Sequence, residues 1–113
     1  MEVNYSLNKV TELASGDNDF IAAIAAAFLD EVPEAVSEIE VGINEGDFVK
    51  VYQNAHKIKP TIQLFDIPVF EDLVMIQNWG KLEQKDKNIA NEFKRLSAII
   101  KTVTSELKSD FKL

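Results

Sequence analysis

The stretch of sequence that decides the fold runs from Asp47 to Phe65 and reads DFVKVYQNAHKIKPTIQLF. Its apolar residues recur in steps of three and four, the spacing that places side chains on one face of an α-helix. They are Phe48, Val51, Ala55, Ile58, Ile62 and Phe65. Asp47 stands just before them, where a carboxylate can cap the start of a helix. The pattern predicts an amphipathic helix with one buried face.

Before this stretch, helical spacing of apolar residues predicts three further helices, and no segment alternates in the manner of a β-strand. The first should cover about Leu7 to Ala14 and stop at Ser15-Gly16, where glycine can adopt a left-handed cap. Asp17 can cap the second helix. A break or kink at Pro33 should end it, because proline lacks a backbone donor and clashes with the preceding turn. The third helix should follow and stop at Gly46.

After this stretch, the same spacing predicts two more helices. Pro68 suits the first turn of one, and Gly80 lies near its end. The last should run from about Asp86 to Lys108, with an apolar seam that requires a partner helix. Short connections make consecutive long helices antiparallel, so the third to sixth helices should close a four-helix bundle, with the first two packed against one end. The predicted fold class is all-α, in a single domain over residues 1–113.

Composition limits the functions open to the protein. Hydrophobic residues make up 46% and charged residues 27% of its 113 residues, a balance typical of a globular domain. The net charge of -7 disfavours nucleic acid as a partner, because binding phosphates requires a clustered basic face. The chain has no cysteine, which excludes disulfides, thiolate metal sites and a cysteine nucleophile. The longest apolar stretch has about half the length that a bilayer crossing needs, and a secretory signal is missing, so we expect a cytoplasmic protein with no membrane partner.

The single histidine, His56, is the first candidate for chemistry. It follows the core residue Ala55 by one position, a rotation of about 100° around the helix, so it should lie at the margin of the buried stripe and reach solvent. A neutral imidazole is a competent nucleophile near pH 7, and a phosphoryl group on a ring nitrogen remains labile enough to be passed on. A histidine in such a place is, however, more often a plain polar residue of the surface.

Three neighbours are candidates to assist His56. Lys59 lies one turn further along, so its ammonium can approach a phosphoryl oxygen, and Gln63 lies about two turns further. Gln77, on the following helix, should lie level with His56 if the two helices form an antiparallel hairpin, and its amide could then bond the ring or the phosphoryl group. Each has a simple alternative, because lysine and glutamine at such positions often only solvate the surface.

Pro60 is the least expected residue of the stretch. It cannot donate the helical hydrogen bond to the carbonyl of His56, so the helix should bend or loosen under the imidazole. Such a bend is either simply tolerated by the helix, or it gives a partner protein room to approach the imidazole. The candidate partner contacts are Val49, Tyr52 and Pro60 on this helix and Ile24 and Phe28 on the second helix. For the last two the core is a strong alternative, since apolar residues at helical spacing are usually buried.

These residues resemble a known family. The segment NAHKIKPT, from Asn54 to Thr61, resembles the signature of histidine phosphotransfer (HPt) domains: alanine, histidine, any residue, leucine, lysine, glycine, then small residues. Upstream, GDNDFI (16–21), FLDEVPE (28–34) and EGDF (45–48) resemble the spacing of that family before its histidine. The resemblance covers nearly the whole chain, about Tyr5 to Lys108.

The resemblance implies that His56 is the phosphoryl acceptor and that Lys59 helps to neutralise the phosphoryl group. Three positions depart from the family pattern. Pro60 stands where the family usually has glycine, Ile62 replaces a small residue, and Asp66 replaces a later glycine. Because the histidine and the lysine are intact, these departures bear on the docking surface and the identity of the partner more than on the chemistry.

The resemblance also implies the reaction and its partners. An aspartyl phosphate on a receiver domain would be attacked by His56, and the phosphohistidine would later donate to another receiver. The partners would be receiver domains of response regulators or of hybrid sensor histidine kinases. The protein would be a phosphocarrier rather than an enzyme, without a cofactor or metal of its own, because the receiver supplies the magnesium ion. We expect a monomer, and the starting methionine favours a free protein over a piece of a hybrid kinase.

Two rival functions remain. One is an HPt-like helical interaction module that binds a receiver or another signalling protein without phosphotransfer, which the altered glycine positions favour. The other is a hydrolase or metal enzyme. The sequence argues against the latter, because it has neither a second histidine nor a recognisable cluster of metal ligands.

Overall fold

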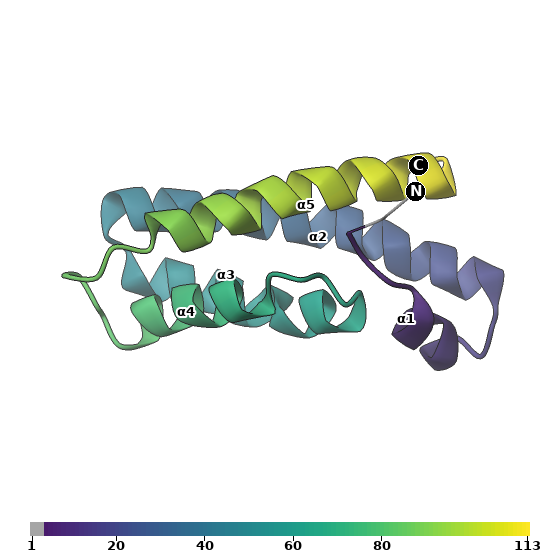
Figure 1. The fold of residues 1–113 in the computed structure, drawn as a ribbon, viewed down its shortest axis with the longest axis horizontal. Helices are drawn as coiled ribbons and strands as arrows, with labels where there is room; N and C mark the ends of the chain where they lie inside the picture. The colour runs from purple at the N-terminus through teal and green to yellow at the C-terminus, as the bar shows by residue number, and fades with distance from the viewer. Residues whose placement is uncertain (1–3) are drawn as a thin grey trace.

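The computed structural model describes residues 4–113 and builds this range from five α-helices (Figure 1). They are α1 (Asn8–Leu13), α2 (Asn18–Glu45), α3 (Phe48–Leu64), α4 (Phe70–Lys81) and α5 (Ala90–Phe111). No β-strand occurs in the described range. The prediction of an all-α protein is therefore confirmed.

One boundary prediction is wrong: the second and third predicted helices are a single helix, α2, of 28 residues with Pro33 inside it. The predicted ends are correct. The Asp17 side chain accepts hydrogen bonds from two amides of the first turn, and Gly46 ends the helix with a left-handed φ of 68°. An interior proline costs about 3 kcal/mol. Burial of Val32 and Val36 on either side contributes about 1.5–3 kcal/mol for each side chain, which offsets that cost.

The four longer helices pack in a closed set of contacts. α2 contacts α3 and α5, and α4 contacts α3 and α5. Figure 1 shows α2 and α5 side by side above α3 and α4. The apolar stripe of α3 faces this interior and is buried at Val51, Ala55, Ile58 and Ile62. The prediction that Asp47 caps this helix is also correct, because its carboxylate accepts a hydrogen bond from the amide of Lys50 at 3.0 Å.

Two helix starts lie later than predicted. Pro68 is not in the first turn of α4, because the chain turns through Asp66, whose φ is 50°, and the helix begins only after Val69. α5 begins at Ala90 instead of Asp86. The loop before it is held by the indole of Trp79, whose Nε1 donates to the Lys87 carbonyl at 3.1 Å. Local hydrogen bonds of the loops therefore replace the first turns that were predicted.

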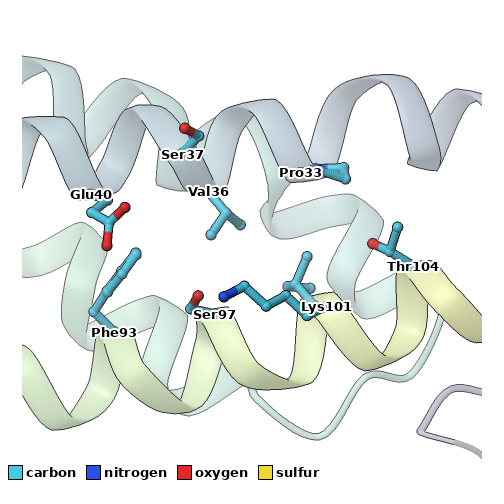
Figure 2. A pocket seen from close by; sticks show the side chains of 9 residues that line it. Pro33, Val36, Ser37, Glu40, Phe93, Ser97, Lys101 and Thr104 are labelled. Carbon is cyan, nitrogen blue, oxygen red and sulfur yellow. The ribbon is translucent and has the colours of Figure 1, made fainter.

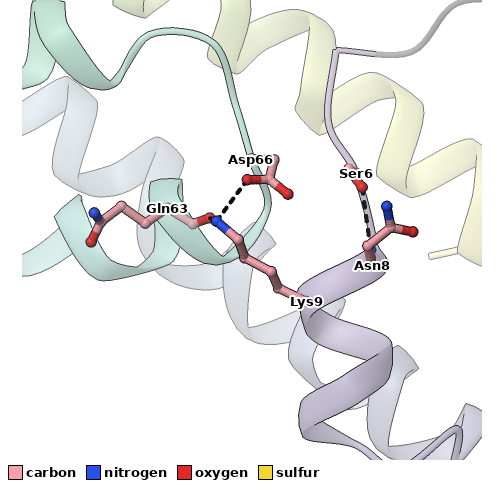
Figure 3. A network of polar contacts seen from close by, with 5 residues as sticks. All are labelled: Ser6, Asn8, Lys9, Gln63 and Asp66. Carbon is pink, nitrogen blue, oxygen red and sulfur yellow. Dashed lines mark hydrogen bonds and ion pairs between the residues drawn. The ribbon is translucent and has the colours of Figure 1, made fainter.

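Residues of α1 and of the segment before it contact the end of α3. The Nζ of Lys9 lies 2.8 Å from a carboxylate oxygen of Asp66 and donates to the Gln63 carbonyl at 3.4 Å (Figure 3). The amide of Ser6 donates to the Phe65 carbonyl at 2.8 Å. Lys9 thus supplies a cation at the carboxyl end of a helix, where the helix dipole favours positive charge.

Tyr5 attaches the same segment to α5. Tyr5 is 7% exposed, and its ring packs edge to face on Phe65, with ring centroids 6.4 Å apart. Its hydroxyl donates a hydrogen bond to the carboxylate of Asp110. Burial raises the pKa of this phenol above its ordinary value, and the carboxylates of Asp110 and Glu106 raise it further. The phenol therefore remains a donor at neutral pH.

None of the helices within residues 4–113 is both long enough and apolar enough to cross a bilayer.

Candidate functional site

His56 lies in the middle of α3 and is exposed. The residue before it, Ala55, is 0% exposed, and Ile58 is 1% exposed. The backbone that carries the imidazole is therefore fixed by the core, while the side chain projects toward solvent. This agrees with its place one position beyond the apolar stripe.

The imidazole of His56 stacks on the ring of Tyr52. The ring centroids are 5.6 Å apart, and the ring planes are inclined by 19°. Side chains of a helix lean toward its amino terminus, so a residue meets the residue four positions earlier. The prediction placed Tyr52 on the same face as a partner contact but missed the stack, which the spacing of four residues could have suggested.

Lys59 is half-buried, one turn beyond His56. The ion pairs in the described part of the chain are Lys9–Asp66, Lys50–Glu38 and Arg95–Asp72. Lys59 therefore has no carboxylate within ion-pair distance among residues 4–113. Its ammonium remains available for a negatively charged group beside His56.

The charge of α3 differs from that of the whole protein. The helix carries three lysines and no acidic residue, so all 19 acidic residues of the chain lie outside it. Over the whole sequence, lysines are interspersed with acidic residues. The helix that carries His56, by contrast, has a positive formal charge. A count of charges by helix would have revealed this from the sequence.

Gln77 lies level with His56, as the predicted hairpin requires. Gly80, three residues later on α4, packs against the backbone of Tyr52, four residues before His56 on the antiparallel α3. Gln77 is 8% exposed, so the alternative of an exposed glutamine is wrong. Its Oε1 is buried and accepts no hydrogen bond from residues 4–113. A buried amide oxygen without a partner is costly, and within the described residues Gln84 Oε1 and Thr104 Oγ1 are in the same state.

Phe28 lies in the core, the alternative that its helical spacing favoured, whereas the assignment of Ile24 as a partner contact stays a prediction. Phe28 is 1% exposed and packs edge to face on Phe65, with ring centroids 5.0 Å apart. Phe65 comes nine residues after His56, about 13 Å further along the helix axis. Ile24 is partly buried against the core.

Gln63 is exposed but lies at the far end of α3. Seven residues separate it from His56, about 10 Å along the helix axis. Its carbonyl accepts the hydrogen bond from Lys9 of α1. Gln63 therefore belongs to the junction with α1, and the structure does not bring it to the imidazole.

The other predicted partner contacts are accessible. Pro60 is exposed, Tyr52 is half-exposed, and Val49 is 63% exposed. Val49 and Tyr52 line a surface hollow of about 540 Å³ that reaches across to Gly80 and Lys81 of α4. The hollow lies on the side toward which the imidazole leans.

A second hollow, of about 340 Å³, lies between α2 and α5 (Figure 2). Its lining residues are Pro33, Val36, Ser37, Glu40, Phe93, Ser97, Ile100, Lys101 and Thr104. Figure 2 shows side chains of both helices pointing into the space between them. Glu40 and Lys101 are its only charged groups, and it contains no histidine. The imidazole face of α3 is therefore the better candidate for group transfer.

The site on α3 contains an exposed imidazole, a stacked aromatic ring and an ammonium one turn further on, and the buried amide of Gln77 lies level with it on α4. Such a set suits the reversible capture of a small anionic group on a ring nitrogen. Comparison of the chain with family models, with curated proteins and with solved structures gave no match.

Proposed function

We propose that the protein is a histidine phosphotransfer carrier of a phosphorelay. His56 accepts a phosphoryl group from an aspartyl phosphate on a receiver domain and passes it to another receiver. The observation that supports this most is an exposed imidazole on a helix fixed by the core, with the ammonium of Lys59 one turn away. In this proposal α2 to α5 form the antiparallel four-helix bundle of the HPt family.

The transfer step is a substitution at phosphorus. The lone pair of a neutral imidazole nitrogen forms the new bond to phosphorus, while the bond between phosphorus and the aspartyl oxygen breaks and the carboxylate leaves with its electron pair. The second ring nitrogen keeps its proton. Such a step depends mainly on in-line placement and on neutralisation of the oxygens. The receiver supplies the magnesium ion, and the carrier contributes no cofactor of its own.

Two further residues assist the imidazole in this proposal. The ammonium of Lys59 balances the charge of the phosphoryl oxygens. Gln77 lies level with His56 on α4, and its buried amide offers a hydrogen-bond donor from the second helix of the site. Both act by placement and charge, and neither exchanges a proton with the phosphoryl group.

The receiver would dock on the face of α3 that carries Val49, Tyr52 and Pro60. The hollow beside Val49 gives an apolar side chain of the partner a place to enter. The positive charge of α3 complements an acidic receiver pocket and steers the encounter. We expect a modest, transient interface, a monomeric carrier and a cytoplasmic location, because a relay must release each partner.

The alternative is an HPt-like interaction module that binds a receiver or another signalling protein without transfer. Pro60 favours it. The proline is exposed on the site face, where the resembled family usually has glycine, and its ring adds bulk beside the imidazole. A partner that cannot approach the nitrogen in line would bind without reacting.

Transfer of radioactive label separates the two functions. Receiver domains charged with ³²P-phosphate by their own kinases are mixed with the wild-type protein. We expect the label to appear on the protein in a form that acid removes and alkali does not, as for a phosphoryl group on histidine nitrogen. Label that stays on every receiver of a broad panel, while the receivers still bind, would favour the interaction module.

Replacing Lys59 with alanine should slow this transfer roughly ten- to a hundredfold. A charge-assisted contact is worth about 1.5–3 kcal/mol, and each 1.4 kcal/mol corresponds to about a factor of ten in rate. The initial rate of label transfer measures the effect. Lys94→Ala, which removes the same charge from an exposed position on α5, is the control and should stay within about twofold of wild type. Equal rates for the two variants would mean that Lys59 only solvates the surface.

A further inference from the structure

The stack of Tyr52 on His56 leaves the imidazole only partly open. With ring centroids 5.6 Å apart and planes inclined by 19°, the phenol ring lies offset beside one face of the imidazole. The other face and the ring edge remain toward solvent, since His56 is exposed. The two residues are one helical turn apart, so the contact needs no distortion of the helix.

Tyr52 is itself held in place by α4. A methyl group at Gly80 would lie 2.8 Å from the backbone nitrogen of Tyr52 and 3.1 Å from its Cβ, so the two helices touch closely at this point. One turn earlier, Phe48 packs on Trp79 of α4 with ring centroids 4.5 Å apart. The segment of α3 that carries the phenol ring is therefore fixed against α4.

We infer that Tyr52 is a positioning residue for His56, a role that rests on the proposed phosphotransfer. An exposed histidine can occupy several side-chain rotamers. The stack holds the imidazole in one of them before a partner arrives, with the nitrogen at the open edge directed outward. Because in-line transfer depends on the placement of the nucleophile, loss of the stack should slow the reaction about three- to tenfold.

A role in partner docking alone would have other consequences. Tyr52 also lines the hollow beside Val49, so its loss would weaken a receiver complex even if the stack had no effect on the imidazole. A small phosphoryl donor avoids this ambiguity, because it does not dock on the protein surface. Potassium phosphoramidate is such a donor: its phosphorus–nitrogen bond breaks and ammonia leaves as the imidazole is phosphorylated.

The first readout is the proton NMR spectrum of the imidazole. His56 is the only histidine, so the signals of its two carbon-bound ring protons can be assigned without ambiguity. In wild type and in Tyr52→Phe, the ring current of the aromatic ring should shift them upfield from those of a free imidazole at the same pH. Tyr52→Leu should lose this shift and keep its helical circular dichroism. Phe20→Leu, which removes a half-exposed aromatic ring near the start of α2, should keep it.

The second readout is the rate of phosphorylation by potassium phosphoramidate. We expect Tyr52→Leu to react about three- to tenfold more slowly than wild type, and Tyr52→Phe and Phe20→Leu to react at nearly the wild-type rate. If either the ring-proton shift or the rate is unchanged in Tyr52→Leu while the wild type reacts, the positioning role is wrong and the proposed function stands. If the wild type accepts no phosphoryl group from phosphoramidate, the proposed function fails, and the positioning role with it.

Discussion

Replacing His56 with glutamine should abolish phosphoryl uptake from every receiver that labels the wild-type protein. The amide of glutamine has a size close to that of the imidazole but no nucleophilic nitrogen lone pair. The chain has no second histidine that could take over the role. Because His56 is exposed and glutamine suits a helix, the variant should fold with a stability within about 0.5 kcal/mol of wild type.

Two measurements belong to this prediction. Thermal unfolding of His56→Gln establishes that the fold is intact, and a binding assay establishes that the variant still captures a charged receiver. Under those conditions the transferred label should fall to background. Acid-labile label that persists on the variant would place the acceptor on another residue and would contradict the assignment of His56.

Replacing Gly80 with alanine should destabilise the protein by about 2–3 kcal/mol. In an ordinary helix interior the same change would stabilise by about 1 kcal/mol. Here the added Cβ would lie 2.7 Å from the Phe48 carbonyl oxygen and 2.8 Å from the Tyr52 nitrogen. Both are backbone atoms, so they cannot turn aside as a side chain can, and α3 and α4 must move apart.

Chemical denaturation measures this cost, with Gly46→Ala as the control. At Gly46 a methyl group meets open space, and only the left-handed φ of 68° opposes it, which costs about 1–2 kcal/mol. The two variants differ in one further respect. Gly80→Ala should also disturb the Tyr52 backbone and with it the imidazole, so its ring-proton signals should move, whereas those of Gly46→Ala should not. A Gly80→Ala variant at least as stable as wild type would refute the close approach of the two helices.

Much of the fold follows from the period of the apolar residues. The stripe of α3 predicts its buried face, and Asp17, Gly46 and Asp47 mark the helix ends that the structure contains. The break at Pro33 was the main error, because local propensity does not count the tertiary burial on both sides of the proline. The residue at which a helix such as α5 begins depends on hydrogen bonds of the preceding loop. The spacing of apolar residues does not reveal those bonds.

The candidate site was predictable to the extent that it lies on one helix. The exposure of His56 follows from its position beside Ala55, and the spacing of four residues is enough to suggest the stack with Tyr52. Contacts between helices were harder to predict from the sequence. Phe28 is buried in the core, which its helical spacing already favoured over a partner contact. The burial of Gln77 depends on the rotation of α4, which the sequence does not specify.

Treatment of the wild-type protein with potassium phosphoramidate, followed by ³¹P and proton NMR, tests the central claim most directly. We predict one acid-labile phosphoryl group for each chain, together with a shift of both ring protons of the single histidine. Ring protons that stay unchanged after prolonged treatment, or a phosphoryl group that survives acid, would contradict the assignment of His56 as the carrier.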